Sequence, residues 1–298
     1  MKSVSLVLGS GGARGLAHIG VIRWLEEHDY DIQSIAGCSM GALVGGIYAA
    51  GKLDEFEQWV RVIRKRDIIS LLDISWNKSG LVKGDKIINT LKEVVGDIKI
   101  GDLPISYTAV AVDVNQEKEI WINSGRLFDA IRASISLPMF FTPHRYNDAY
   151  LIDGGVLNPV PIAPTFSDTT DITIAVNLGG KLTVKDENNS TNEEKSNTGI
   201  NEKISSYINK LKDKIDLTTN ILTPNIDWDA YDIANQAFDA MQSTIARQKL
   251  AAYPPDISIE IARNACATLE FDRADEMIEL GYEKAQDSLK QFELASEL

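Results

Sequence analysis

The pentapeptide GCSMG at residues 37–41 places Ser39 midway between two glycines. A β-like apolar run precedes it and an uncharged helical run follows, so Ser39 is predicted on a sharp turn from a strand into a helix. Such a turn needs tiny residues where strand and helix cross, and Gly37 and Gly41 meet that need. The chemistry this pattern favours is nucleophilic attack by the serine hydroxyl, with the Met40 amide donating to the oxyanion that develops.

A nucleophilic serine needs a base, and none of the three histidines is clearly placed to be one. An order of aspartate, histidine, serine is excluded, because no histidine lies between the first aspartate and the serine. An order of serine, acid, histidine would end at His144 and use an acid such as Asp113 or Asp129. Nothing in the sequence supports that arrangement, and it stays open. The two earlier histidines fall in the first predicted helix and are interpreted as packed or surface residues.

A carboxylate is the other candidate base. Asp153 ends a predicted strand in the stretch LIDGGVLNPVP, and two glycines follow it. Because glycines let the backbone approach another loop closely, the Asp153 side chain could be held against Ser39. A plain Asp-Gly turn is the alternative, and the residues alone leave both open. An aspartate with its usual pKa of about 3.9 is a weak base, so this hypothesis predicts apolar surroundings that raise the pKa of Asp153.

A glycine-rich loop supplies the third candidate group. The stretch GSGGARG at residues 9–15 joins the first predicted strand to the first predicted helix, so its consecutive amides could cradle an oxyanion. The rival is a dinucleotide-binding fingerprint, but Arg14 stands where its third glycine should let helix and strand pack closely. We favour an oxyanion or substrate-binding loop formed by Gly11, Gly12 and Ala13. Arg14 would orient this loop or meet a phosphate head group, and the first role is preferred.

Four segments follow one another in a set order: SGGARG, GCSMG, ASISLP at residues 133–138, and DGG at residues 153–155. In this combination the chain resembles the patatin-like phospholipase family over residues 1–180. The resemblance implies a three-layer α/β/α fold with a mostly parallel central sheet and a dyad of Ser39 and Asp153. It also implies oxyanion donors at Gly11 and Gly12, lipid acyl hydrolysis, no metal for the dyad chemistry and no cofactor. Ser10 departs from the glycine that many members of the family carry, which affects the shape of the loop.

The expected function is that of a serine acyl hydrolase, either a phospholipase A or a lysophospholipase or esterase, acting through an acyl-enzyme. A noncatalytic lipid-binding protein is the main alternative, and a dinucleotide-binding protein is a weaker one. The expected partner is a lipid or another fatty-acyl ester. The net charge of −13 argues against nucleic acid and against purely electrostatic attachment to anionic lipid. The sequence does not indicate an oligomeric state.

Cysteine usage indicates the compartment. The chain has two cysteines, Cys38 and Cys266, which cannot form a disulfide framework. A reducing, cytoplasmic location is therefore expected, with peripheral contact at a membrane surface as an added possibility. Cys38 adjoins the proposed nucleophile, and it is interpreted as a small buried residue rather than a reactive thiol.

Two consecutive strand–loop–helix units at the start of the chain predict parallel strands whose following loops gather at one edge of a sheet. The uncharged run at residues 32–51 is long enough to resemble a membrane span, but its glycines favour a buried strand, a turn and a buried helix. Strands are expected at residues 3–8, 34–36, 105–113, 118–123, 149–155, 171–180 and 256–261. Helices are expected at residues 13–28, 40–50, 54–66, 84–95, 125–134, 200–217, 229–250 and 272–295.

The expected domain organisation is a catalytic core at residues 1–180, a flexible polar loop at 181–201, and a helical part at 202–298 that packs on the same domain. The predicted helix after the polar loop is amphipathic and carries lysines on or beside one face. It is the best local candidate for contact with a bilayer, although core packing is favoured. Its lysines are Lys203, Lys210, Lys212 and Lys214.

Overall fold

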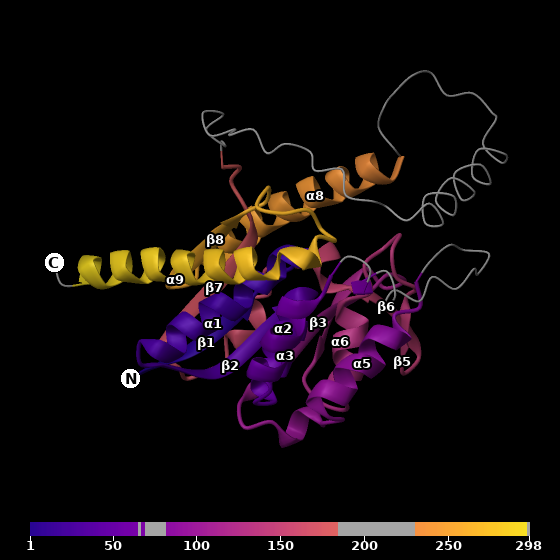
Figure 1. Ribbon diagram of the computed structural model, residues 1–298, viewed down its shortest axis with the longest axis horizontal. Helices are drawn as coiled ribbons and strands as arrows, with labels where there is room; N and C mark the ends of the chain where they lie inside the picture. Colours follow the sequence, from indigo (N-terminus) through magenta and orange to yellow (C-terminus); the bar gives the residue numbers. More distant parts are fainter. Residues whose placement is uncertain (65–66, 69–81, 184–229, 297–298) are drawn as a thin grey trace. The chain divides into compact units, whose positions relative to one another are not determined.

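The computed structural model describes residues 1–64, 67–68, 82–183 and 230–296 (Figure 1). The chain divides into two units, one formed by Met1–Thr183 with Ala237–Leu298 and the other by Val184–Gln236. In the second unit the described residues form the beginning of one helix, α8 (Ala230–Ala252). The polar loop predicted at 181–201, from residue 184 onward, and the lysine-bearing helix predicted at 200–217 lie outside the described residues.

One mixed sheet forms the centre of the first unit, with the strand order β5-β6-β3-β2-β1-β7-β8 and with β4 paired to β3. The four strands from β3 to β7, and β8 beyond them, are parallel, whereas β4, β5 and β6 run antiparallel to their neighbours. The strands are β1 (Lys2–Leu8), β2 (Tyr30–Cys38), β3 (Ser106–Asp113), β4 (Lys118–Ile122), β5 (His144–Tyr146), β6 (Ala149–Asp153), β7 (Ile172–Gly180) and β8 (Ile257–Ala262).

The order of the strands reverses direction at β1. From β1 the chain passes to β2 and β3 on one side, whereas β7 and β8 are added on the other side. Right-handed crossovers in opposite directions put their connecting helices on opposite faces of a sheet. The loop that leaves β1 at this reversal therefore lies where open α/β sheets bind their ligands, outside the carboxyl ends of the strands. That loop is the glycine-rich stretch at residues 9–15.

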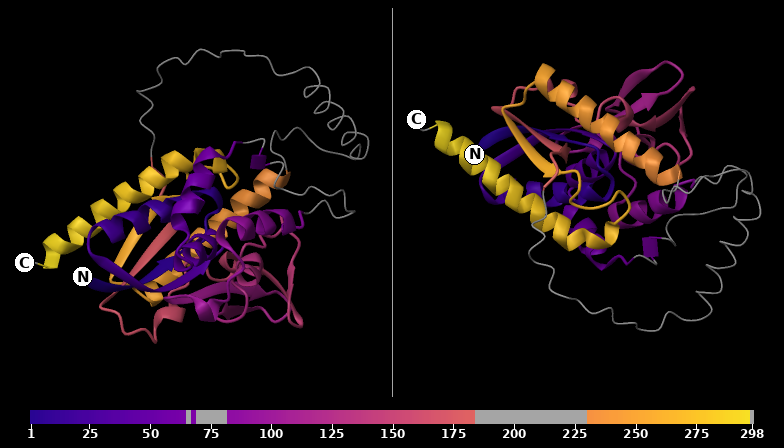
Figure 2. Two further views of the ribbon diagram at one scale, coloured as in Figure 1. Left: turned by 60° about the horizontal axis from the view of Figure 1, so that its bottom comes forward. Right: turned by 90° about the horizontal axis from the view of Figure 1, so that it is seen from above.

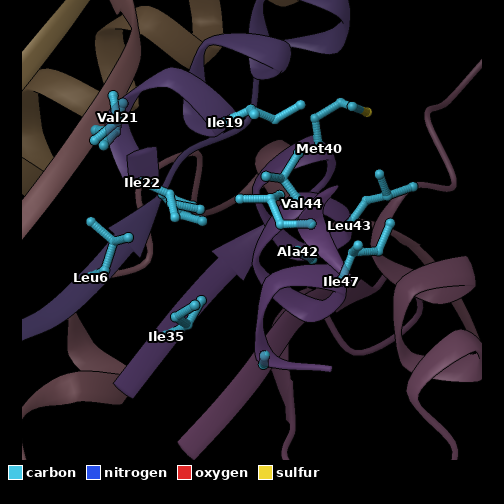
Figure 3. Packing of buried hydrophobic residues seen from close by; sticks show 14 of the residues in the cluster. Leu6, Ile19, Val21, Ile22, Ile35, Met40, Ala42, Leu43, Val44 and Ile47 are labelled. Atoms are coloured by element: carbon cyan, nitrogen blue, oxygen red, sulfur yellow. The ribbon is translucent and has the colours of Figure 1, made fainter. Parts of the chain in front are cut away.

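The first face of the sheet carries an apolar core. Helices α1 (Ala17–Glu27), α2 (Met40–Ala49), α6 (Leu127–Ser134) and α9 (Ala274–Ser296) cover it, and α3 (Leu53–Val62) and α5 (Asp85–Val95) lie against them. Leu6 and Ile35 of the strands pack on Ile22 of α1 and on Val44 and Ile47 of α2 (Figure 3). Nine of the ten residues of α2 are buried, which explains why this helix carries no charged face.

Helices α1 and α9 run side by side (Figure 1 and Figure 2). Their contact depends on two glycines, one on each helix. A Cβ atom on Gly20 would lie 1.9 Å from the carbonyl oxygen of Ile278, and one on Gly281 would lie 1.9 Å from that of Ala17. The two backbones therefore touch, which anchors the C-terminal helix on the N-terminal one.

The second face is covered by α8, which connects β7 to β8, and by the chain that follows β6. Val7 and Ala175 alternate along their strands with residues of the first core, so they point to this other face, where they pack against Ala246 of α8. Helices on both faces confirm the predicted three-layer α/β/α fold with a mostly parallel sheet. No helix in the described part of the chain combines the length and the apolar character needed to cross a bilayer.

Candidate active site

Ser39 lies in the turn between β2 and α2, as its flanking glycines predict. Its backbone has φ 53° and ψ −125°, a left-handed conformation that costs a serine on the order of 1–3 kcal/mol. Strand and helix cross closely here, because a Cβ on Gly37 would lie 2.5 Å from the Gly41 carbonyl and one on Gly41 would lie 2.0 Å from the Leu8 oxygen. The turn thereby aims the Ser39 side chain away from the strand that carries it.

The Ser39 hydroxyl meets a carboxylate. Its Oγ donates a hydrogen bond of 2.5 Å to Oδ2 of Asp153, at the end of β6, and Asp153 is fully buried. The other oxygen of Asp153, Oδ1, accepts from the Gly155 amide at 2.7 Å. Burial raises the pKa of Asp153 to about 7, and the hydrogen bonds from Ser39 and Gly155 oppose that rise. The carboxyl group can therefore exchange a proton near neutral pH.

The segment ASISLP holds both of these residues in place. The Ser134 hydroxyl accepts from the Ser39 amide at 2.9 Å and donates to the Val110 carbonyl at 2.6 Å. Two residues on, the Ser136 carbonyl accepts the Asp153 amide at 3.0 Å. From the sequence this segment contributes only to the family resemblance, and its serines have no evident role. No local pattern indicates these contacts, because Ser134 ends α6 and its partners lie 95 and 24 residues away.

Some backbone amides near Ser39 donate hydrogen bonds to carbonyl groups of the protein, and others do not. Three amides of the glycine-rich loop have carbonyl acceptors: Gly9 to Val176 at 3.0 Å, Ser10 to Pro159 at 2.8 Å and Ala13 to Thr268 at 2.9 Å. In the described part of the chain, the amides of Gly11, Gly12 and Met40 have no such acceptor. Gly12 has φ +56°, and a Cβ there would lie 2.5 Å from the Thr268 oxygen. The engaged amide of Ala13 is not available to an oxyanion, whereas the other three are.

Arg14 is turned away from the cavity and into the protein. Its Nη1 donates to the Arg263 carbonyl at 2.5 Å, its Nη2 donates to Oδ1 of Asp239 at 3.1 Å, and the residue is 4% exposed. A guanidinium with these partners ties the glycine-rich loop to α8 and to the chain after β8. Of the two roles weighed from the sequence, this geometry fits orientation of the loop.

An apolar cavity opens beside Ser39. It encloses about 910 Å³ when the open space at its mouth is included. Ser39 and Met40 stand at one wall, and most of the remaining lining comes from aliphatic and aromatic side chains. These include Leu16, Leu43, Phe56, Trp59, Val60, Leu91, Ile135, Leu137, Phe140, Phe141 and Phe271. A site of this kind suits a hydrocarbon chain attached to a group that reaches the serine hydroxyl.

None of the three histidines, all of which lie within the described residues, is hydrogen-bonded to the Ser39 hydroxyl. Burial lowers the pKa of His18 to about 4, and its Nε2 lies 2.9 Å from the Gly9 carbonyl oxygen, so the ring is neutral at pH 7. His144 lies on β5, where burial and then the charge of Arg132 lower its pKa. Among the hydrogen bonds of the described residues, none joins the Ser39 hydroxyl to an imidazole.

The Cys38 thiol, next to Ser39, is not activated. The Cys38 thiol donates to the Pro159 carbonyl at 3.3 Å, and burial raises its pKa well above the usual value, so it stays protonated. This agrees with the interpretation of Cys38 as buried filling. Over the described ranges, no group of three or more His, Cys, Asp or Glu side chains is arranged to hold a metal ion.

The chain is similar to several known proteins. A family model described as patatin-like phospholipase matches residues 6–166. An uncharacterized NTE family protein of Mycobacterium bovis is 38% identical, in an alignment that covers 98% of this chain and 92% of that protein. Lysophospholipase NTE1 of Eremothecium gossypii is 30% identical over 60% of this chain, which corresponds to 12% of its own length. Among solved structures, VipD from Legionella pneumophila covers 98% of this chain and 67% of its own, with 15% identity and a TM-score of 0.47.

Proposed function

The chain belongs to the patatin-like phospholipase family and is a lipid-ester hydrolase, and from this premise we propose that Ser39 and Asp153 are its catalytic dyad. The observation that carries the proposal is the 2.5 Å hydrogen bond from Ser39 Oγ to a buried carboxylate. The three unengaged amides and the apolar cavity beside the same hydroxyl support it.

In the proposed reaction the acyl chain of the substrate lies in the cavity and its ester carbonyl faces Ser39. The Ser39 oxygen attacks the carbonyl carbon while Oδ2 of Asp153 takes the hydroxyl proton. The resulting oxyanion accepts hydrogen bonds from the amides of Gly11, Gly12 and Met40. Asp153 returns the proton to the departing alcohol as the ester bond breaks, which leaves an acyl-enzyme. A water molecule then attacks the acyl group, with Asp153 again taking and returning the proton.

Asp153 must be ionised to act as the base. Because burial raises its pKa to about 7, we expect kcat/KM to rise as the pH increases through about 7 and then to level off. An aspartate with the usual pKa would instead be ionised throughout this range and give no such rise.

The substrate class that fits is a fatty-acyl ester. Lysophospholipase activity is named for the matched fungal relative, and the apolar cavity beside the serine is consistent with binding of an acyl chain. Phospholipase A, lysophospholipase and simple esterase activities all fall within the proposal. Peripheral membrane contact and a cytoplasmic location stay predictions from the sequence.

Labelling with a fluorophosphonate, which reacts with activated serines, tests the dyad. We expect wild type to be labelled and to hydrolyse a short-chain p-nitrophenyl ester, and Ser39→Ala to lose both properties. Asp153→Asn should lose at least about 10²-fold in kcat, because general-base help is removed. His144→Ala is the matched control and should stay active. An inactive His144→Ala beside an active Asp153→Asn would reject the dyad, and an unlabelled wild type would favour a noncatalytic lipid-binding protein.

A further inference from the structure

Helix α8 contacts the glycine-rich loop at two points. Oδ1 of Asp239 accepts from Nη2 of Arg14 at 3.1 Å, and Nε2 of Gln242 donates to the Ser10 hydroxyl at 3.2 Å. Asp239 and Gln242 are three residues apart and so share one face of the helix. Both contacts link this helix to residues more than two hundred positions earlier in the chain.

We propose that Asp239 and Gln242 are positioning residues that fix the direction of the Gly11 and Gly12 amides. This inference rests on the proposed function, because it assigns those amides to the oxyanion. Neither α8 side chain lines the cavity beside Ser39, so both would act through the loop and not on the substrate.

The loop needs such support because of its composition. Gly11 and Gly12 are adjacent, and Gly12 has φ +56°. Glycine adopts this conformation readily but does not restrict the backbone to it. Ser10 and Arg14 stand on either side of these glycines, and α8 holds both of them. A flexible pair of residues is thus fastened at its two ends by one rigid helix. Oxyanion donors are effective when their direction is fixed before the reaction.

The charge balance at Arg14 gives Asp239 a specific task. The Arg14 side chain is 5% exposed and Asp239 is the carboxylate paired with it, whereas its other acceptor is a backbone carbonyl. A buried cation that loses its counterion is strongly destabilised where it lies and tends to move toward water. Removing the Asp239 charge should therefore displace Arg14, and the loop that carries it, without touching Ser39 or Asp153.

The Gln242 contact explains the departure from the family pattern at Ser10. Ser10 and Gln242 are 9% and 8% exposed, so their hydrogen bond is made inside the protein. A Cβ on Gly155 would lie 2.5 Å from the Ser10 hydroxyl and 2.3 Å from Nε2 of Gln242. The pair therefore packs on the backbone whose amide binds Asp153. The serine at position 10 supplies the hydroxyl that this second point of attachment requires.

The test uses two substitutions that preserve side-chain shape. Asp239→Asn removes the charge, and Gln242→Met removes a neutral hydrogen bond, which keeps the test valid if the loss of charge weakens the fold. Gln248→Ala, at an exposed position of the same helix, is the matched control. We expect kcat for a soluble ester to fall about 10-fold to 100-fold in the first two variants, because misdirected donors weaken transition-state binding. KM should stay within about twofold of wild type, because that loss is not felt by the bound substrate.

Two further readouts separate positioning from general damage. The rise of activity near pH 7 should keep its midpoint in both variants, because Asp153 is untouched, and Asp239→Glu should recover most of kcat. The double variant Arg14→Gln with Asp239→Asn should be no less active than Arg14→Gln alone, because both changes act on one contact. Equal kcat in Gln248→Ala, Asp239→Asn and Gln242→Met, or a shifted midpoint, would overturn the inference. Failure of wild type to hydrolyse any ester would instead overturn the proposed function.

Discussion

The two faces of the central sheet differ in the polarity of the side chains that pack on them. On the first face α1, α2 and α9 pack through a continuous apolar core and through glycines that let backbones touch. On the second face the apolar cluster is small, formed by Val7, Val160, Ile162, Ala175 and Ala246, and buried polar side chains also lie on this face. Gln242 and Ser243 of α8 are two of these polar residues, and Asn177 lies on the same side of β7 as Ala175.

The two faces therefore differ in what they contribute: one mainly stabilises the fold, and the other orients the loops of the site. Burying one large apolar side chain contributes about 1.5–3 kcal/mol, whereas a hydrogen bond contributes only about 0.5–1.5 kcal/mol net and requires a defined geometry. The first face therefore supplies most of the folding energy. The second face contributes less energy and fixes directions, and it does so beside the loops that carry the proposed oxyanion donors and the proposed base. Three predictions test this comparison.

The largest expected effect is on the first face. Gly20→Ala should destabilise the protein by at least about 3 kcal/mol, because the new Cβ would lie 1.9 Å from the Ile278 oxygen and force α1 and α9 apart. A loss of stability would point to this clash, since alanine otherwise stabilises a helix by up to about 1 kcal/mol relative to glycine. Urea unfolding followed by circular dichroism measures it. Gly101→Ala, where no atom lies within 4 Å of the new Cβ, is the control and should change stability little.

The second prediction concerns Asp153, where the proposed chemistry opposes stability. Its pKa is raised from 3.8 to about 7 in the folded protein, so the folded state holds the proton more tightly than the unfolded state. Stability should therefore be greatest below pH 4 as far as this group is concerned, and should fall as the pH rises through about 7. Above that pH the ionised group costs about 4 kcal/mol, from 1.36 kcal/mol per unit of pKa.

Asp153→Asn removes this cost along with the proposed base. At pH 8 the variant should be more stable than wild type, and the difference should shrink as the pH is lowered toward 5. Chemical denaturation at pH 5, 6, 7 and 8 measures the trend, with Asp168→Asn as a control that leaves the buried pair intact. A difference that does not change with pH would mean that Asp153 is not buried as a charged group. The expected dependence on pH would show that the proposed site lowers the stability that the first face provides.

The sequence predicted local features well. The turn at Ser39 and the loop at Gly11 and Gly12 follow from residues that are neighbours in the chain, so spacing alone indicates them. The base could not be predicted from local spacing. An arrangement ending at His144 and the carboxylate of Asp153 both stayed open until the family resemblance favoured Asp153. Strand β2 was predicted too short, since Asp31 and Gln33 obscure a run in which Tyr30 and Ile32 are buried on alternate positions.

Contacts made over long separations could not be predicted. The hydrogen bonds of Ser134 and Asp239 are examples, because their partners lie 95 and 225 residues away. Strand β5 is a different case: it pairs with its neighbour β6 across a two-residue turn, and it was missed because it has only three residues. Polar residues on a helix usually indicate a face exposed to solvent. On α8 Gln242 and Ser243 are buried whereas Met241 is exposed, so amphipathicity alone does not identify the buried face of this helix.

The smallest expected effect lies at the edge of the second face. Lys249 of α8 pairs with Glu119 at 2.8 Å, and Glu119 also accepts from the Asn158 amide group at 2.9 Å, in the loop that follows Asp153. The two ionic side chains are 29% and 21% exposed, so Lys249→Met should change the free energy of unfolding by no more than about 1 kcal/mol. If this face fixes directions, kcat should nevertheless fall several-fold, because Glu119 would lose its cationic partner and would hold Asn158 less firmly.

A matched change on the first face completes the test. Lys284 of α9 pairs with Asp287 at 3.7 Å on the surface, and Lys284→Met should alter neither stability nor kcat. Urea unfolding and ester hydrolysis, measured on both variants, compare the same chemical change on the two faces. Equal kcat in the two variants would contradict the division of roles, because a loss of one lysine charge would then have the same result wherever it occurs. A loss of kcat in Lys249→Met alone, at nearly constant stability, would indicate that the Lys249 contact acts on the site through Glu119 and the loop after Asp153.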